Sequence, residues 1–241
     1  MKIAIEILLL IIILMCTWNG YKKGLVMCIG TILAIIISLY VGDLLSDTFS
    51  PAVKPVLRPF VGGYMDGSDG VISNNLKDLL DGNKAGLSVD DALKQYPEIK
   101  SQLIENSYKD VGIFTPSAKK MATEAVDLVE ANSLSVTSAT VDVLCGSVTY
   151  FFGFIIFFVI TMIVLTVLGN ILNLSFKIPE KEKLNYIGGA VAGAITGIMF
   201  CMIITWILKF SGALFPEEEM RRTLLTALFL KMDVMSVFLT I

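Results

Sequence analysis

The chain has 241 residues, of which 55% are hydrophobic and 17% are charged, and its formal net charge is −3. This composition is typical of a membrane protein, and so small a negative charge does not suggest binding to nucleic acid. The chain contains no histidine, and its four cysteines lie in or beside apolar runs without the spacing of a metal site. We therefore expect no metal, no cofactor and no disulfide framework.

The chain begins with two apolar runs, residues 3–18 and 25–41, which a short polar segment joins. Two glycines in this segment permit a tight backbone reversal, and two lysines belong in water. These hairpin-turn residues are Gly20, Lys22, Lys23 and Gly24. Residues 1–42 are therefore predicted to form a transmembrane helical hairpin.

Residues 43–142 form a polar insert with fifteen acidic and nine basic residues and no run that could cross a bilayer. The insert begins with three prolines at intervals of four residues, Pro51, Pro55 and Pro59, which argue against an uninterrupted helix at its start. Short helices are predicted around residues 76–80, at residues 89–96 behind a Ser88 cap, and from Thr115 onward, where Pro116 follows the cap. The insert is either a small helical domain or a set of helices on the membrane. Because it has few large apolar residues, we favour extramembrane helices that dock against the membrane part.

Residues 143–210 contain the third and fourth predicted spans. The third lies within residues 143–176, with its excess length projecting from the bilayer. The fourth covers residues 184–208, where glycines recur every four residues: Gly189, Gly193 and Gly197. In a helix this spacing places small residues on one face, which predicts a close packing seam with another helix. We expect Gly193→Leu to disrupt this seam and Gly193→Ala to be nearly tolerated, with Gly212→Leu as a neutral control.

Residues 211–241 are predicted to form a C-terminal amphipathic helix that lies in the membrane interface or against the bundle. The paired lysines Lys22 and Lys23 orient the first hairpin with its turn in the cytoplasm. Both termini and the long insert are then expected outside. Cysteines introduced at Asn83 and Asn185 would distinguish the two sides by labelling.

Three polar residues are candidates for an intramembrane role: Glu6, Asn170 and Asn173. Glu6 interrupts the first span near its outer end, where it can reach headgroup water or pair with a neighbour. The two asparagines share a helix face near the end of the third span. They mark its exit from lipid, bond a neighbouring helix or line a polar path.

The acid in the first span, the turn at residues 20–25 and the segment LNYIGGAVAG at residues 184–193 resemble the bacterial colicin V production protein family (CvpA). The resemblance covers the four spans and their order, but neither the acidic insert nor the extended tail. It implies a bacterial inner-membrane protein linked to toxin production or export and to envelope upkeep. It implies no catalytic residue.

The fold class we predict is an all-α membrane protein with four transmembrane helices. No nucleophile is paired with a base at helical spacing, so we expect no enzyme. The first functional hypothesis is a non-catalytic accessory factor, and the alternative is a transport or channel subunit that oligomerises through the glycine seam. The partners considered are the lipid bilayer, a second copy of the chain and an envelope protein, with no nucleic acid.

Overall fold

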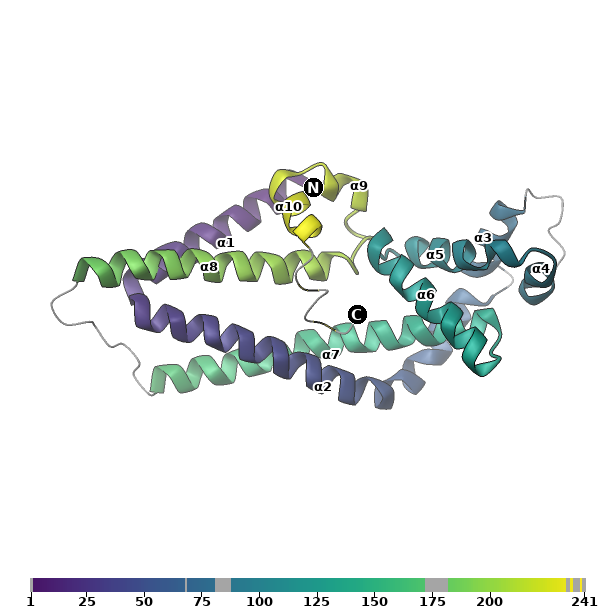
Figure 1. Cartoon of the computed structure of the whole chain (residues 1–241), viewed down its shortest axis with the longest axis horizontal. Coiled ribbons are helices and arrows are strands. Elements are labelled where there is room, and N and C mark those ends of the chain that lie inside the picture. The colour runs from purple at the N-terminus through teal and green to yellow at the C-terminus, as the bar shows by residue number, and fades with distance from the viewer. Residues whose placement is uncertain are drawn as a thin grey trace. The chain divides into compact units, whose positions relative to one another are not determined.

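The computed structural model describes residues 2–67, 69–80, 88–171 and 182–232, together with residues 235 and 239. The described residues form helices and contain no strand. In chain order the helices are α1 (Lys2–Lys23), α2 (Leu25–Met65), α3 (Val71–Leu79), α4 (Val89–Gln95), the 3-10 helix η1 (Pro97–Ile99), α5 (Lys100–Asp110), α6 (Thr115–Asn132), α7 (Val136–Ile171), α8 (Glu182–Leu208), α9 (Glu217–Arg221) and α10 (Leu224–Met232) (Figure 1).

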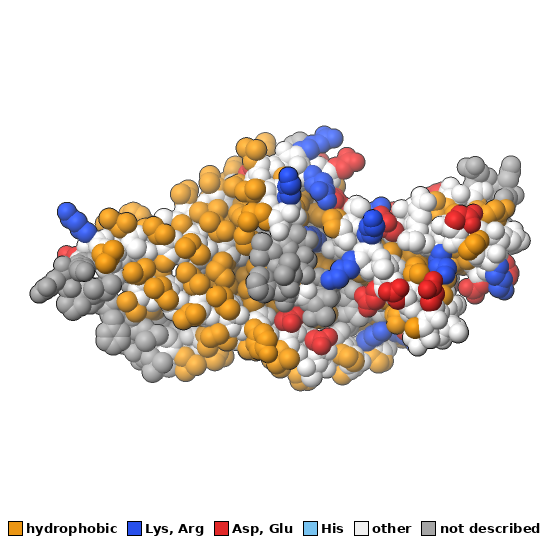
Figure 2. Space-filling view, viewed as in Figure 1, with side chains coloured by type: hydrophobic (Ala, Val, Ile, Leu, Met, Phe, Trp, Pro, Cys, Tyr) orange, Lys and Arg blue, Asp and Glu red, His pale blue; other side chains and the backbone are white. Residues whose placement is uncertain are grey.

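Four of these helices, α1, α2, α7 and α8, are long and apolar enough to cross a membrane by length and composition. The all-α fold with four candidate spans is therefore confirmed. Figure 2 shows how the surface is divided: hydrophobic side chains cover the candidate spans, whereas charged side chains gather over the helices of the insert. The helices run across the positions predicted to separate the spans from the insert, because α2 continues past residue 42 and α7 begins at Val136.

The chain divides into two compact units. The membrane unit comprises Met1–Asp47, Gly153–Leu208 and Glu218–Thr240, and the insert unit comprises Thr48–Phe152 and Lys209–Glu217, with Ile241. Each unit is built from segments that are far apart in the sequence.

In the membrane unit, α1 packs against α8, and α2 packs closely against α7. A methyl group at Gly42 of α2 would lie 3.3 Å from the backbone nitrogen of Phe158, and one at Gly153 of α7 would lie 2.8 Å from Ser46 Oγ. Phe154 of α7 meets Trp206 of α8 edge to face, with ring centroids 5.0 Å apart. Small residues and aromatic pairs thus bring the spans together, as expected where burial of apolar groups provides no drive between helices.

Helix α2 continues through Pro51, Pro55 and Pro59, so the expectation of a broken helix at the start of the insert was wrong. Each proline lacks the N–H that would bond the carbonyl four residues earlier. Because the prolines are themselves four residues apart, the carbonyls left without that bond lie on one side of the helix. All three prolines are exposed, so solvent can satisfy those carbonyls and the helix persists.

The insert unit has a hydrophobic core of its own rather than only helices docked on the membrane part. Its largest fully buried side chains come mainly from the short helices: Met65, Ile72, Leu103, Ile104, Tyr108, Met121 and Leu144. The core is completed by Met65 at the end of α2 and by residues of the first turns of α7, among them Val136 and Leu144. The prediction undercounted the core because it assigned this part of α7 to the polar insert and the third span.

The helix starts in the insert follow local sequence signals. Ser88 Oγ accepts a hydrogen bond from the Asp91 backbone N–H at 3.2 Å, which confirms the predicted cap of α4. The hydrogen bond that Ser88 Oγ donates to the carboxylate, reinforced by Lys94, lowers the pKa of Asp91. Helix α6 begins at Thr115, one residue earlier than a Thr115 cap would place it, and Ala118, Met121, Ala122 and Ala125 form its buried stripe.

The segment after α8 is fixed to the corner between α5 and α6, within the insert unit. Phe114 N–H donates to the Lys209 carbonyl at 2.9 Å, and Gly212 N–H donates to the Gly112 carbonyl at 2.7 Å. Thr115 N–H donates to Glu217 Oε2 at 2.7 Å. Gly112 has a φ of +95°, which favours glycine, and a methyl group there would collide with Ala213.

Candidate functional site

The candidate site is the contact between α1 and α8, which run antiparallel in the membrane unit (Figure 1). The three glycines of the α8 seam face the backbone of α1 without any intervening side chain. The facing pairs are Gly189 with Gly20, Gly193 with Cys16, and Gly197 with Ile13. A methyl group at Gly197 would lie 2.8 Å from the Ile13 Cα atom, and one at Gly193 would lie 3.0 Å from the Gly20 Cα atom.

This geometry changes two expectations about substitutions. Even a Cβ atom at Gly193 would collide with the carbonyl oxygen of Cys16, so Gly193→Ala is disruptive rather than nearly tolerated. Gly212 packs against the backbone of Gly112, so it is not a neutral control. A methyl group added at Gly30 of α2 would have no neighbouring atom within 4 Å, which makes Gly30 the appropriate control.

The hairpin turn is tighter than predicted. Helix α1 extends to Lys23, and Gly24 alone makes the turn, with a φ of +86°. Gly20 lies inside α1, where it allows the close approach of Gly189 and Gly193 rather than the reversal of the chain.

Asn185 of α8 holds this turn from the opposite side. Its Oδ1 atom accepts a hydrogen bond from the Leu25 backbone N–H at 3.0 Å, which satisfies a donor at the start of α2. The side chain is buried and packs over Gly24. Sequence reasoning missed this role, although a lone amide at the start of an uncharged span was the available signal. A cysteine at Asn185 would remove this contact, and Asn83, the other proposed labelling position, lies outside the described residues.

Aromatic rings and lysines surround the same end of the seam. Trp18 stacks on Tyr21 with centroids 6.1 Å apart, and Tyr21 lies 5.3 Å from the ring of Tyr186 on α8. Lys22 Nζ lies 5.1 Å above the ring of Trp18. Such a combination of amphipathic rings and cations is typical of a membrane–water boundary.

Glu6, near the other end of α1, bonds the first residues of α10. Its Oε1 atom accepts hydrogen bonds from the backbone N–H groups of Leu224 and Leu225, at 2.8 Å and 3.0 Å. These are donors that a helix leaves without an internal partner, and a carboxylate also suits the positive end of the helix dipole. The described part of the tail thus includes two short helices, α9 and α10, and α10 is capped by Glu6 of the first span.

Asn170 is not part of this site. Asn170 is exposed near the end of α7, and Asn173 lies outside the described residues. On α8, the hydroxyls of Thr196 and Thr205 bond backward to the carbonyls of Ala192 and Cys201 in the same helix. The seam is thus a packing site, and its polar groups are used to hold helix ends.

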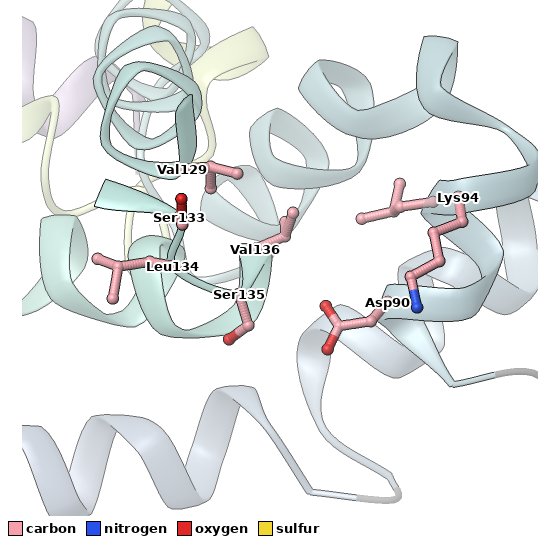
Figure 3. Close-up of a pocket in the computed structure, with 8 residues that line it drawn as sticks. Asp90, Lys94, Val129, Ser133, Leu134, Ser135 and Val136 are labelled. Carbon is pink, nitrogen blue, oxygen red and sulfur yellow. The ribbon is translucent and has the colours of Figure 1, made fainter. Parts of the chain in front are cut away.

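A cleft of about 400 Å³ lies in the insert unit beside the α6–α7 connection (Figure 3). Figure 3 shows Asp90 and Lys94 of α4 on one side and the connection between α6 and α7 on the other. The cleft is lined by Asp90, Leu93, Lys94, Val129, Ser133, Leu134, Ser135 and Val136. Ser135 Oγ accepts the Ser138 N–H at 3.2 Å, so this hydroxyl caps α7. Within the described ranges, no group of three or more Cys, Asp or Glu side chains is placed to hold a metal ion.

Comparison with known proteins identifies one family. Residues 117–234 match the family described as Colicin V production protein. The match begins in α6, includes α7 and α8, and ends beyond α10. No curated protein and no solved structure was found to match the chain. The resemblance to this family seen in the sequence is thereby confirmed.

Proposed function

Because residues 117–234 match the colicin V production protein family, we propose that this chain is a non-catalytic accessory factor of that type. It acts in the production or export of a colicin V-like toxin, or in upkeep of the bacterial envelope, from the inner membrane. The resemblance seen in the sequence and the family match agree on this class. The four candidate spans support a multi-pass membrane protein.

The observation that favours an accessory role over transport is the use made of the α1·α8 seam. Its glycines are in contact with α1 of the same chain, so oligomerisation through that face would require α1 to leave. Glu6 is bonded to α10 and Asn185 to the start of α2. Transport sites are usually built from polar groups that face a cavity between helices, whereas these groups hold the ends of other helices.

The test is deletion of the gene in its own bacterium, followed by complementation. Toxin activity in the medium and growth in detergent are measured for the deletion strain, the restored strain and a strain that carries Gly30→Leu as a folded control. Loss of secreted toxin or of detergent resistance, restored by the complementing gene, is expected. In parallel, purified protein in liposomes is expected to give no ion efflux above empty liposomes. Ion efflux clearly above that of empty liposomes would support the transport alternative and overturn the accessory role.

For topology, our proposal is a cytoplasmic hairpin turn with both termini and the insert outside. The lysines at the turn support this orientation, and the aromatic rings beside them mark a membrane boundary there. Exposed positions replace those suggested by the sequence: Lys183 at the start of α8 and Thr123 in α6. In a background without native cysteines, Thr123→Cys is expected to react with an impermeant thiol reagent in intact cells, and Lys183→Cys only after permeabilisation. The opposite result would reverse the orientation.

A further inference from the structure

An exposed apolar stripe runs along the part of α2 that belongs to the insert unit. Its five side chains are 48% to 75% exposed, although all are apolar or aromatic. They are Phe49, Val53, Val56, Phe60 and Tyr64. A contiguous apolar surface of this kind on a folded unit marks an interaction site.

The spacing of the stripe is that of a helix pair. Its successive members are four, three, four and four residues apart. At 3.6 residues per turn they fall within an arc of about 80° on one side of α2. The first four follow the alternation of three and four residues that defines the a and d positions of a coiled coil.

The residues that would obstruct such a pairing lie elsewhere on the helix. Pro51, Pro55 and Pro59 fall outside the arc of the stripe. The two cations of this segment are engaged with α7, where Arg58 Nε lies 3.1 Å and Lys54 Nζ lies 4.0 Å from the Asp142 carboxylate. The stripe therefore brings no like charges to a partner that carries the same sequence.

Lipid cannot cover the whole stripe. This part of α2 lies along α7, and α7 shows how far the stripe extends from the apolar surface of the spans. Ser50 Oγ lies 2.5 Å from Thr149 Oγ1, and Arg58 Nη2 donates to Ser138 Oγ at 2.8 Å. Helix α7 contains no proline and is continuous from Val136 to Ile171. Ser138 is about 21 Å along α7 from Phe152, where the exposed apolar side chains of that helix begin. The far half of the stripe thus lies beyond the reach of the headgroup layer.

We propose that the stripe is covered by the same stripe of a second copy of this chain. Two copies inserted in one membrane share their orientation, so a twofold axis along the bilayer normal brings the two α2 helices together in parallel. In parallel pairing each a and d residue meets its own counterpart, which suits an uncharged seam of Val and Phe. This surface is separate from the glycine seam, which α1 occupies.

Disulfide crosslinking in native membranes tests this arrangement, in a background where the four native cysteines are alanine. Val56→Cys and Phe60→Cys are expected to form a crosslinked dimer at least threefold more efficiently than two exposed controls. Pro51→Cys lies on the other side of the same helix, and Thr123→Cys lies on α6. Equal crosslinking at the stripe and the controls would overturn the proposal.

Two further measurements identify the occupant of the stripe. Adding Phe60→Glu to Val56→Cys is expected to abolish the crosslink without lowering the amount of folded protein in the membrane, because Phe60 is 75% exposed within a single chain. A nitroxide at Phe60→Cys is expected to be shielded from both oxygen and a water-soluble nickel chelate. High access to oxygen alone would show lipid, and high access to the chelate would show water; either result overturns the proposal.

Discussion

The α1·α8 pair and the core of the insert unit are held together in opposite ways. In the pair, the backbones of two helices touch through glycines, and large side chains such as Leu14 and Val191 point outward. In the insert, large side chains such as Leu103, Tyr108 and Met121 fill the space between short helices. Lipid is as apolar as leucine, so only close contact favours the pair, whereas water drives the apolar side chains of the insert inward. The pair should therefore be sensitive to added atoms and the insert to removed ones.

Adding a side chain to the pair should have the largest effect. Gly193→Leu is expected to lower the free energy of unfolding by about 4 kcal/mol, because the α1 and α8 backbones must separate. Thermal unfolding in detergent measures the change. Gly30→Leu, in a span but with open space around it, is the matched control. Equal melting temperatures for the two variants would show that the seam does not hold the pair.

Removing a side chain from the insert should have a slightly smaller effect. Leu103→Ala leaves a cavity at a fully buried position and is expected to cost about 3 kcal/mol. Leu14→Ala removes the same atoms from a side chain of α1 that is 59% exposed, and less than about 1 kcal/mol is expected. Denaturant titration of both variants compares them. Similar losses would contradict the distinction between the two regions.

The stability lost with the Asn185 contact should be smaller than in these two packing variants and larger than for a single surface contact. Asn185→Leu leaves the Leu25 N–H without its acceptor, which is expected to cost about 2 kcal/mol. Hydrogen exchange at the Leu25 amide should accelerate. The exposed neighbour Ile187→Ala serves as the control, and unchanged exchange in Asn185→Leu would contradict the role assigned to the amide.

Tyr108 gives the insert a dependence on alkaline pH. Its hydroxyl donates to the Thr140 carbonyl at 3.0 Å, and burial raises the pKa of Tyr108 well above its ordinary value of 10.0. The unfolded chain ionises first, so the folded state loses stability as the pH rises above about 10. Tyr108→Phe is expected to cost about 1 kcal/mol at neutral pH and to reduce this alkaline loss. Unfolding curves at pH 8 and pH 11 measure the change for both proteins. An equal loss of unfolding free energy between the two pH values in the native protein and in Tyr108→Phe would contradict this role of Tyr108.

The smallest effect is expected at the cap of α10. Glu6→Ala removes the acceptor of two backbone donors and should cost about 1 kcal/mol, confined to the tail. Glu6→Gln retains a side-chain oxygen and should behave almost as the native protein does. Hydrogen exchange at Leu224 and Leu225 separates the two variants, and equal exchange in both would remove Glu6 from the role of cap.

Local features of the sequence predicted much of this fold. Hydropathy located the four spans, and the Ser88 cap and the α6 stripe followed from spacing within one helix. The partner of the glycine seam could not be predicted, because its counterpart on α1 consists of Gly20, Cys16 and Ile13 within an ordinary apolar run. The pairing of Glu6 with α10 joins opposite ends of the chain and leaves no local pattern.

Two other predictions differed from the structure because the environment of a residue decides its effect on a helix or a core. The prolines of α2 are accommodated because the carbonyls they leave unbonded are on an exposed side, which spacing alone does not reveal. The core of the insert depends on Met65 and on the first turns of α7, which belong to helices that also supply the spans. In both cases a helix serves two environments, and a division of the sequence at the membrane boundary separates residues that act together.

The long separation in sequence between α1 and α8, the two helices of the glycine seam, has a consequence during synthesis. The hydrogen bond between Leu25 and Asn185 joins residues 160 positions apart. At about 5–20 residues per second, the ribosome completes that interval in roughly 8–32 s. Throughout this delay the first hairpin resides in the bilayer with the face around Gly20 uncovered. During this interval an unrelated helix with small residues, or an insertion chaperone, can occupy the place on α1 that α8 later takes.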